Sequence, residues 1–244
     1  MDWLTYFERN RVNRLREAIP WERGFNVEPQ LRAPLIQSLQ RFQVGEQGEG
    51  LHLKRGAAAT GEAAYAAAIN LFVAEEQEHA RLLARVVRGL GGELLEGHWS
   101  DACFILLRHL SGLHLELMVL LVAEMIAKRY YQALSEGTND AVLKTVFDQI
   151  LRDEFGHVAF HSDFLHGAFA PLPLPLRHLM RGLWAILFRA VCLVVLYDHR
   201  AVLRATGVSP RAFWYDCGVI FAETATESFN PASALEKAKF RRVE

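Results

Sequence analysis

The sequence predicts an all-α protein, a helical bundle, and three observations lead to this prediction. Long segments carry apolar residues at helical spacing, and no stretch alternates between apolar and polar residues as a strand would. Prolines fall mainly at the ends of these segments, where the missing N–H donor is tolerated. Hydrophobic residues make up 51% and charged residues 23% of the 244 residues, so the chain can bury a substantial core.

The helical segments divide the chain into three parts. We expect an N-terminal helix near residues 2–18, four long helices near 31–58, 61–90, 101–135 and 139–168, and two more near 176–205 and 210–227. The run Pro-Leu-Pro-Leu-Pro at 171–175 must interrupt the helices, and Ser209 followed by Pro210 suits a helix start. This pattern predicts an N-terminal helix and linker over 1–29, a four-helix bundle over 30–170 and a C-terminal helical extension over 171–244.

Composition excludes several classes of protein. The formal net charge is −1, and the basic residues near 237–242 form only a short tail, so no nucleic-acid partner is expected. Cys103, Cys192 and Cys217 are far apart and form no CxxC motif, which fits a reducing compartment. No leader-like pattern follows Met1, and we therefore expect a cytoplasmic protein.

The longest apolar run extends from Gly182 to Tyr197 and is interrupted by Arg189. It is short for a membrane-spanning helix, which needs roughly 20 apolar residues. The run favours a helix packed on the bundle, and a helix lying on a membrane surface is the alternative.

Two Glu-x-x-His motifs point to metal chemistry, Glu76-Gln77-Glu78-His79 and Glu154-Phe155-Gly156-His157. Residues three apart lie on one face of a helix, so the Glu and His of each motif can bind one ion together. A single motif of this kind is weak evidence, because Glu49-Gly50-Leu51-His52 has the same pattern.

The spacing of upstream glutamates strengthens the signal. Glu46 precedes Glu76 by 30 residues and Glu124 precedes Glu154 by the same number, with turn-like sequence at both midpoints. In an antiparallel helical hairpin, residues equidistant from the turn meet at one height, here about 22 Å from it at 1.5 Å per residue. Two such hairpins, packed together, bring six predicted metal ligands to one level. These residues are Glu46, Glu76, His79, Glu124, Glu154 and His157.

Burial gives an independent argument for metal. Glu124 is the only charged residue in the stretch 117–127, which is apolar on every helical face. An ionised carboxylate in an apolar interior is very costly unless it is paired or bound to metal. Four converging carboxylates also repel one another, and two divalent cations would cancel that charge.

The predicted ligand set resembles that of the ferritin-like di-iron carboxylate superfamily, in which a Glu from each of two helices joins a Glu-x-x-His from each of two others. Gly45-Glu46-Gln47 and the 76–79 motif look like motifs of rubrerythrins, ubiquinone-biosynthesis hydroxylases and cyanobacterial aldehyde-deformylating oxygenases. Residues 124–131 resemble the third helix of the deformylating oxygenases. Residues 153–157 are similar to the motif of ribonucleotide-reductase small subunits and bacterial multicomponent monooxygenases. The resemblance covers residues 30–170 and implies a ferritin-like four-helix bundle.

Three acidic neighbours of the ligands need separate interpretation. Glu49 competes with Glu46 as a ligand, but Ala127 holds the matching position on the other hairpin, which favours Glu46. Glu75 and Asp153 each precede a predicted ligand. In the related monooxygenases an acid at this place hydrogen-bonds the histidine of the other hairpin, so the resemblance implies the pairs Asp153–His79 and Glu75–His157. Exposed helix charges are the alternative.

Two further residues are candidate catalytic groups. His161 lies seven residues after Glu154 on nearly the same helix face. It could contact the ligands, be an extra ligand or donate a proton, and a buried structural histidine is the alternative. Tyr131 holds the matching position after Glu124, where core packing is the alternative. Glycines at 45, 48 and 50 are unfavourable within a helix by about 1 kcal/mol each. They leave space for dioxygen or substrate, or they mark a helix end near residue 44.

Carboxylate and imidazole ligands without thiolate suit iron or manganese, so we expect two Fe ions, with Mn/Fe as an alternative. The resemblance implies a di-iron oxygenase or oxidase that uses dioxygen to oxidise a small, largely apolar substrate. An external electron donor is then needed, because the chain has no flavin, haem or iron–sulfur motif. The C-terminal helices would roof a substrate pocket or form a homodimer interface. A ferritin- or rubrerythrin-like iron-handling or peroxide-scavenging protein is the main alternative, and a tRNA hydroxylase is disfavoured by the near-neutral charge.

Overall fold

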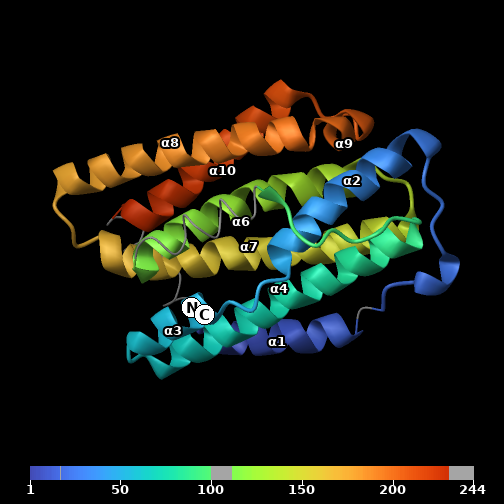
Figure 1. The fold of residues 1–244 in the computed structure, drawn as a ribbon. Coiled ribbons are helices and arrows are strands. Elements are labelled where there is room, and N and C mark those ends of the chain that lie inside the picture. Colours follow the sequence, from blue (N-terminus) through green and yellow to red (C-terminus); the bar gives the residue numbers. More distant parts are fainter. Residues whose placement is uncertain (17, 100–111, 231–244) are drawn as a thin grey trace, which may run out of the picture.

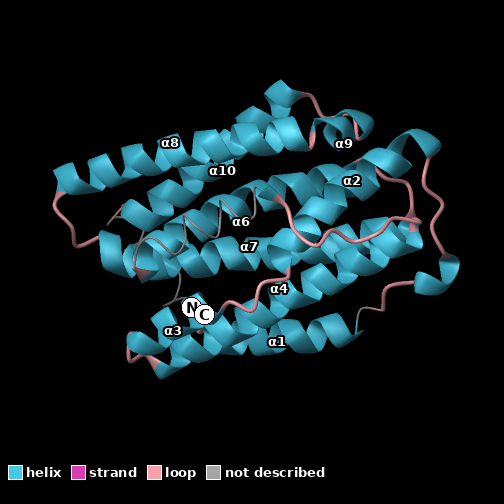
Figure 2. Cartoon of the chain, in the orientation of Figure 1, coloured by secondary structure: helices cyan, strands magenta, loops and turns pink. Residues whose placement is uncertain are grey.

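The structure is a computed structural model that describes residues 1–16, 18–99 and 112–230. All regular structure in these ranges is helical, which confirms the all-α prediction for the described part of the chain (Figure 2). The elements are α1 (Trp3–Arg16), the short 3-10 helix η1 (Trp21–Arg23), α2 (Pro29–Glu46), α3 (Leu51–Ala59), α4 (Ala63–Gly89), α6 (Leu113–Glu136), α7 (Ala141–Phe169), α8 (Leu174–Asp198), α9 (Arg200–Ala205) and α10 (Pro210–Phe229).

The helices α6 and α7 form an antiparallel pair in the middle of the molecule (Figure 1). Helices α4 and α1 lie on one side of this pair, and α8 and α10 pack on the other. One continuous hydrophobic core runs through all of them, from Phe7 of α1 through Leu121 of α6 to Trp184 and Phe188 of α8. The N-terminal and C-terminal helices therefore share the core of the central helices.

Local signals in the sequence explain where several helices begin. The Asp140 side chain accepts a hydrogen bond from the Leu143 backbone N–H at 2.8 Å and so caps α7. Ser209 caps α10 in the predicted way, accepting from the Ala212 N–H at 3.1 Å, and Pro210 is the first residue of that helix. The proline-rich run separates α7 from α8 as predicted, because α7 ends at Phe169 and α8 begins at Leu174.

The prediction of one helix over 31–58 is wrong. Helix α2 ends at Glu46 and α3 begins at Leu51, with Gly50 at φ +61° between them. This left-handed backbone conformation favours glycine, and a Cβ at Gly50 would also lie 2.7 Å from a methyl group of Val73. The glycines at 45, 48 and 50 therefore mark a helix end, which lies at Glu46, two residues after the alternative end near residue 44.

The third predicted bundle helix and the two C-terminal helices also differ in detail. Residues 101–111 of the predicted helix lie outside the described residues, and the described helix begins at Leu113. The helix predicted over 176–205 is divided at His199 into α8 and α9. Helix α8 has 25 residues and is long and apolar enough to cross a membrane by length and composition, and only 17% of its most apolar window is buried.

Candidate metal centre

The structure brings all six predicted ligand residues together from four helices. Glu46 is the last residue of α2, Glu76 and His79 come from α4, Glu124 from α6, and Glu154 and His157 from α7. Their ligand atoms form two overlapping groups, Glu76 with Glu124, Glu154 and His157, and Glu46 with His79 and Glu154. Within each group all ligand atoms lie within 4.8 Å of one another, so each group can hold a metal ion.

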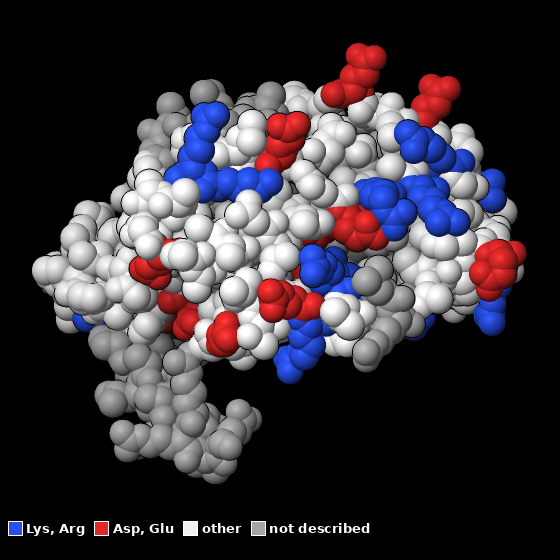
Figure 3. All heavy atoms as spheres, turned by 90° about the horizontal axis from the view of Figure 1, so that it is seen from below, with Lys and Arg blue, Asp and Glu red and all other residues white. Residues whose placement is uncertain are grey.

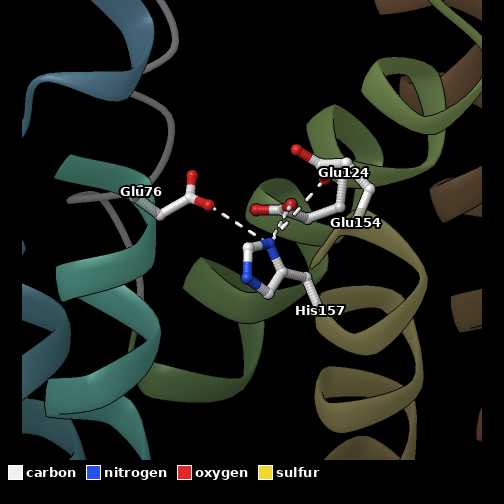
Figure 4. Close-up of side chains that lie close together, drawn as sticks. All are labelled: Glu76, Glu124, Glu154 and His157. Atoms are coloured by element: carbon white, nitrogen blue, oxygen red, sulfur yellow. Dashed lines mark ion pairs between the residues drawn. The ribbon is translucent and has the colours of Figure 1, made fainter. Parts of the chain in front are cut away.

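Both histidines turn the same ring nitrogen toward the carboxylates. His157 Nδ1 lies 3.1 Å from Glu76 Oε1 and 3.4 Å from Glu124 Oε2, and Figure 4 shows these carboxylates converging on its ring. His79 Nδ1 lies 3.5 Å from Glu76 Oε1 and 3.7 Å from Glu154 Oε1. Glu154 belongs to both groups, so its carboxylate could contribute to holding an ion in either of them.

The other ring nitrogen of each histidine contacts an acid from the opposite hairpin. Asp153 Oδ2 lies 3.0 Å from His79 Nε2, and Glu75 Oε2 lies 3.0 Å from His157 Nε2. These are the two contacts that the resemblance implies. A carboxylate at Nε2 keeps a proton on that nitrogen, so Nδ1 is the nitrogen that would bind a metal ion.

Helix α1 supplies two residues that the sequence reasoning missed. The Asn10 side-chain amide donates to Glu75 at 2.9 Å and to Asp153 at 2.8 Å, and the Arg14 guanidinium forms ion pairs with the same two carboxylates. A signal for this contact was present, because Trp3, Phe7, Asn10 and Arg14 share one helix face at spacings of four, three and four.

Glycine 156 lets α1 approach closely enough for these contacts. A Cβ at this position in α7 would collide with the Tyr6 hydroxyl group and ring. Phe7 of α1 also packs against Phe160 of α7, with ring centroids 5.1 Å apart. The glycine inside the second Glu-x-x-His motif is therefore required by helix packing.

The site passes a test of fit for metal. The buried atoms without a hydrogen-bond partner include Nδ1 of His79 and of His157, Oε1 of Glu76 and Oε2 of Glu154. Buried polar atoms are normally satisfied, so four unsatisfied ligand atoms facing one another call for a common partner. Oxygen and imidazole donors of this kind suit iron or manganese.

The acidity of the ligands reflects the same crowding. Burial, together with the negative charge of neighbouring glutamates, holds the pKa of Glu46 and of Glu154 well above the usual range. Burial alone would also raise the pKa of Glu76, but the nearby imidazole rings of His157 and His79 outweigh it and lower this pKa to about 2. Burial opposes protonation of His157, but the carboxylates close to its ring, Glu124 foremost, raise its pKa well above the usual range. In the metal-free protein, protons bound to these side chains therefore neutralise part of the negative charge that metal cations would otherwise neutralise.

The competing ligand and the two candidate catalytic residues occupy different surroundings. Glu49 is exposed and belongs to neither ligand group. The Tyr131 hydroxyl donates to Glu46 Oε1 at 3.2 Å, and so it touches a ligand. His161 is fully buried outside both groups, with its ring against Phe72 at 4.6 Å. Burial lowers the pKa of His161 to about 3, so the ring is uncharged near neutral pH, and proton donation by His161 stays a prediction.

An apolar pocket of about 390 Å³ connects the carboxylates to the molecular surface. Glu46, Glu76, Glu124 and Glu154 line its inner part, and Gly45, Gly48 and Gly50 line one wall. Exposed residues such as Trp99 and Val194 line its outer part. The break between α2 and α3 therefore provides the space that a continuous helix would have filled with its side chains.

Comparison with known proteins adds no family assignment. No protein-family model matches the chain, and no curated protein sequence matches it significantly.

Proposed function

We propose that this chain is a ferritin-like di-iron oxidase or oxygenase that acts on a small, largely apolar substrate. The observation that carries the proposal is the convergence of unsatisfied Nδ1 and carboxylate oxygen atoms at the inner end of an apolar pocket. Glu46, Glu76, His79, Glu124, Glu154 and His157 would hold two iron ions, with Mn/Fe as the alternative. The bound metal would supply the reduction of dioxygen, using electrons from an external donor.

The residues around the ligands have separable tasks in this proposal. Asp153 and Glu75 keep the imidazole rings of His79 and His157 oriented with Nδ1 toward the carboxylates. The Tyr131 hydroxyl orients the carboxylate of Glu46, the last residue of α2. Apolar walls exclude water from the pocket, so a substrate binds there through its own apolar surface.

The pocket is the specific reason to prefer substrate oxidation over iron storage. A storage protein needs a path for hydrated iron, whereas this pocket is lined, apart from the carboxylates and Arg41, Asp198 and His199, mainly by aliphatic and aromatic side chains, including Phe42, Phe72, Leu120 and Val191. A ferritin- or rubrerythrin-like role would also predict uptake of many iron ions per chain or rapid consumption of peroxide.

The test is metal content after anaerobic loading with ferrous iron, measured by elemental analysis. We expect two iron ions per wild-type chain and at most one in Glu124→Ala, because the removed carboxylate lies among the ligand atoms around His157. Glu49→Ala is the matched control and should keep both ions, because Glu49 is exposed. Consumption of dioxygen by the loaded wild type, but not by Glu124→Ala, would support oxidase chemistry. No bound iron in the wild type would refute the proposal, and a cage-sized assembly with many ions per chain would favour storage.

A further inference from the structure

Helix α8 presents an apolar face to the outside of the molecule. It lies along the outer surface of the bundle (Figure 1). Only Trp184, Phe188 and Cys192 of this helix are buried. Opposite them, exposed apolar residues recur three, four or seven apart, with exposed Arg189 in the longest interval, and form what we call the α8 stripe. The α8 stripe consists of Leu176, Leu179, Leu183, Ile186, Leu193 and Tyr197, which are between 40% and 68% exposed.

A helix that is apolar on all sides normally belongs in a protein core or in a membrane. Helix α8 has a mean hydropathy of 2.0 over its most apolar window, yet that window is only 17% buried. Its inner face is held in place, because Trp184 Nε1 donates to the Met118 carbonyl of α6 at 2.8 Å and Phe188 stacks on Phe221 of α10 at 4.7 Å. These contacts suit a helix that lies in the plane of an apolar surface, and spanning a membrane would break them.

The charge of α8 and α9 is mainly basic. Residues 174–205 contain five arginines and one acidic residue, whereas α10 carries Arg211 together with Asp216, Glu223 and Glu227. Arg181, Arg189, Arg200 and Arg204 are exposed. The face on the far side of the molecule, over α1 and α4, carries acidic and basic residues mixed together (Figure 3). Basic residues beside an apolar stripe are complementary to anionic phospholipid headgroups.

Exposed aromatic residues of α10 extend the same region. Tyr215 is 71% and Trp214 is 36% exposed, and α10 packs directly against α8. Together with Tyr197, whose ring lies 4.4 Å below the Arg200 guanidinium, they are the residue types that settle at the boundary between acyl chains and headgroups.

The pocket of the candidate metal centre opens beside the α8 stripe. Ala190 and Val194 of α8 both line the pocket and are exposed. A molecule on the outer side of α8 can therefore reach Glu124 and Glu154 along apolar side chains.

We propose that the α8 stripe and the exposed aromatic residues of α10 dock on a lipid bilayer that contains anionic phospholipid, and that the pocket accepts an apolar molecule dissolved in it. The proposal that the protein docks on a bilayer is argued from the exposed face of α8 and α10 alone. The proposal that the pocket accepts an apolar molecule rests on the proposed function. A second copy of the chain fits α8 less well, because residues 174–205 of each copy carry five arginines and only one acidic residue, and like charges would meet.

The docking test is sedimentation with vesicles of phosphatidylcholine alone and of phosphatidylcholine with phosphatidylglycerol. We expect the protein to bind the anionic vesicles more strongly, and Leu183→Ser with Ile186→Ser to reduce binding by about tenfold or more, because each buried side chain contributes at least that factor. The control pair is Val12→Ser with Leu51→Ser, which removes two exposed apolar side chains from α1 and α3. It should bind like the wild type.

Other outcomes would overturn the docking proposal. The docking proposal fails if the wild type binds neither kind of vesicle. It also fails if the wild type is a dimer that binds no vesicles and the Leu183→Ser, Ile186→Ser variant is a monomer. Equal loss of binding in the control pair would show that the contact is not specific to α8. Glu124→Ala is expected to bind vesicles normally, so failure of the metal proposal and failure of the docking proposal remain distinguishable.

The pocket statement has a separate test with cis-parinaric acid, a fluorescent fatty acid, added to the vesicle-bound protein. Ala190→Trp, at the outer end of the pocket, should keep vesicle binding but reduce binding of the probe about tenfold, since the indole fills the opening. Unchanged binding of the probe would show that the pocket is not its site.

Discussion

Arg14 of α1 is expected to be critical for the metal site although it contacts none of the six predicted ligands. Its guanidinium is ion-paired with both Glu75 and Asp153, whose side chains are 3% and 2% exposed. Asn10 bridges the same two carboxylates, so they lie close together as well as being buried. The Arg14→Met substitution keeps much of the apolar stem and removes the positive charge.

The expected magnitude follows from burial. Removing one partner of a buried ion pair costs about 3–5 kcal/mol, because the remaining charge is left uncompensated. Arg14 itself is 11% exposed, so solvent screens the pair only weakly. For a chain of this size that loss lowers the melting temperature by about 6–20 °C. Release of the carboxylates that orient His79 and His157 should also weaken metal binding by about 10–100-fold.

The assays are thermal denaturation followed by circular dichroism and anaerobic titration with ferrous iron. Arg11→Met is the matched control, because Arg11 is an exposed arginine on the same helix. If Arg14→Met melts within a few degrees of Arg11→Met and binds iron with wild-type affinity, the bridge from α1 has no energetic role and the reasoning fails.

Three further predictions concern protons, the glycine break and the helix α1 contact. Because the pKa values of Glu46 and Glu154 are raised in the folded state, the metal-free protein binds more protons than the unfolded chain above about pH 4.5 and loses stability as the pH rises further. Metal must displace these protons, so iron should raise the melting temperature more at about pH 8 than at about pH 5, and binding should release protons that a pH indicator detects. Equal increases in melting temperature at both pH values would contradict the assignment of these glutamates as metal ligands. Gly50→Ala should destabilise the protein by about 1–2 kcal/mol in urea denaturation, because alanine is strained at φ +61°, and an unchanged midpoint would argue against the helix break. Gly156→Ala should lower both stability and iron affinity by pushing Tyr6 of α1 away from α7, and loss of stability without loss of affinity would separate α1 from the metal site.

The sequence by itself determined which residues meet at the site. For Glu124 and Glu154, convergence follows from helical rise and from equal distances to the turn near Asn139, and both quantities can be counted along the chain. Glu46 also reaches the site, but the helix predicted between it and the turn near Gly61 is broken at Gly50, so helical rise alone does not explain its position. The sequence also determined the cap at Ser209 and the proline-rich interruption, since a side chain that begins or ends a helix acts within one turn of that helix end.

Other features depended on how the helices pack, and only the tertiary structure decided them. The glycines at 45, 48 and 50 permitted either an open helix or a helix end, and the contact between Gly50 and Val73 of α4 decided for the end. His161 shares a helix face with Glu154, but its ring packs against Phe72 and belongs to neither ligand group, which spacing along one helix does not specify.

The roles of α1 and α8 show the same limit most clearly. The spacing of Asn10 and Arg14 indicates a buried face, but which carboxylates they meet depends on where α1 docks across α4 and α7. Helix α8 carries apolar residues on its exposed face as well as on its buried face, so its sequence alone does not indicate which face is buried. Only the packing of Trp184 and Phe188 determines which side faces the bundle, and therefore which side is left to meet another apolar surface.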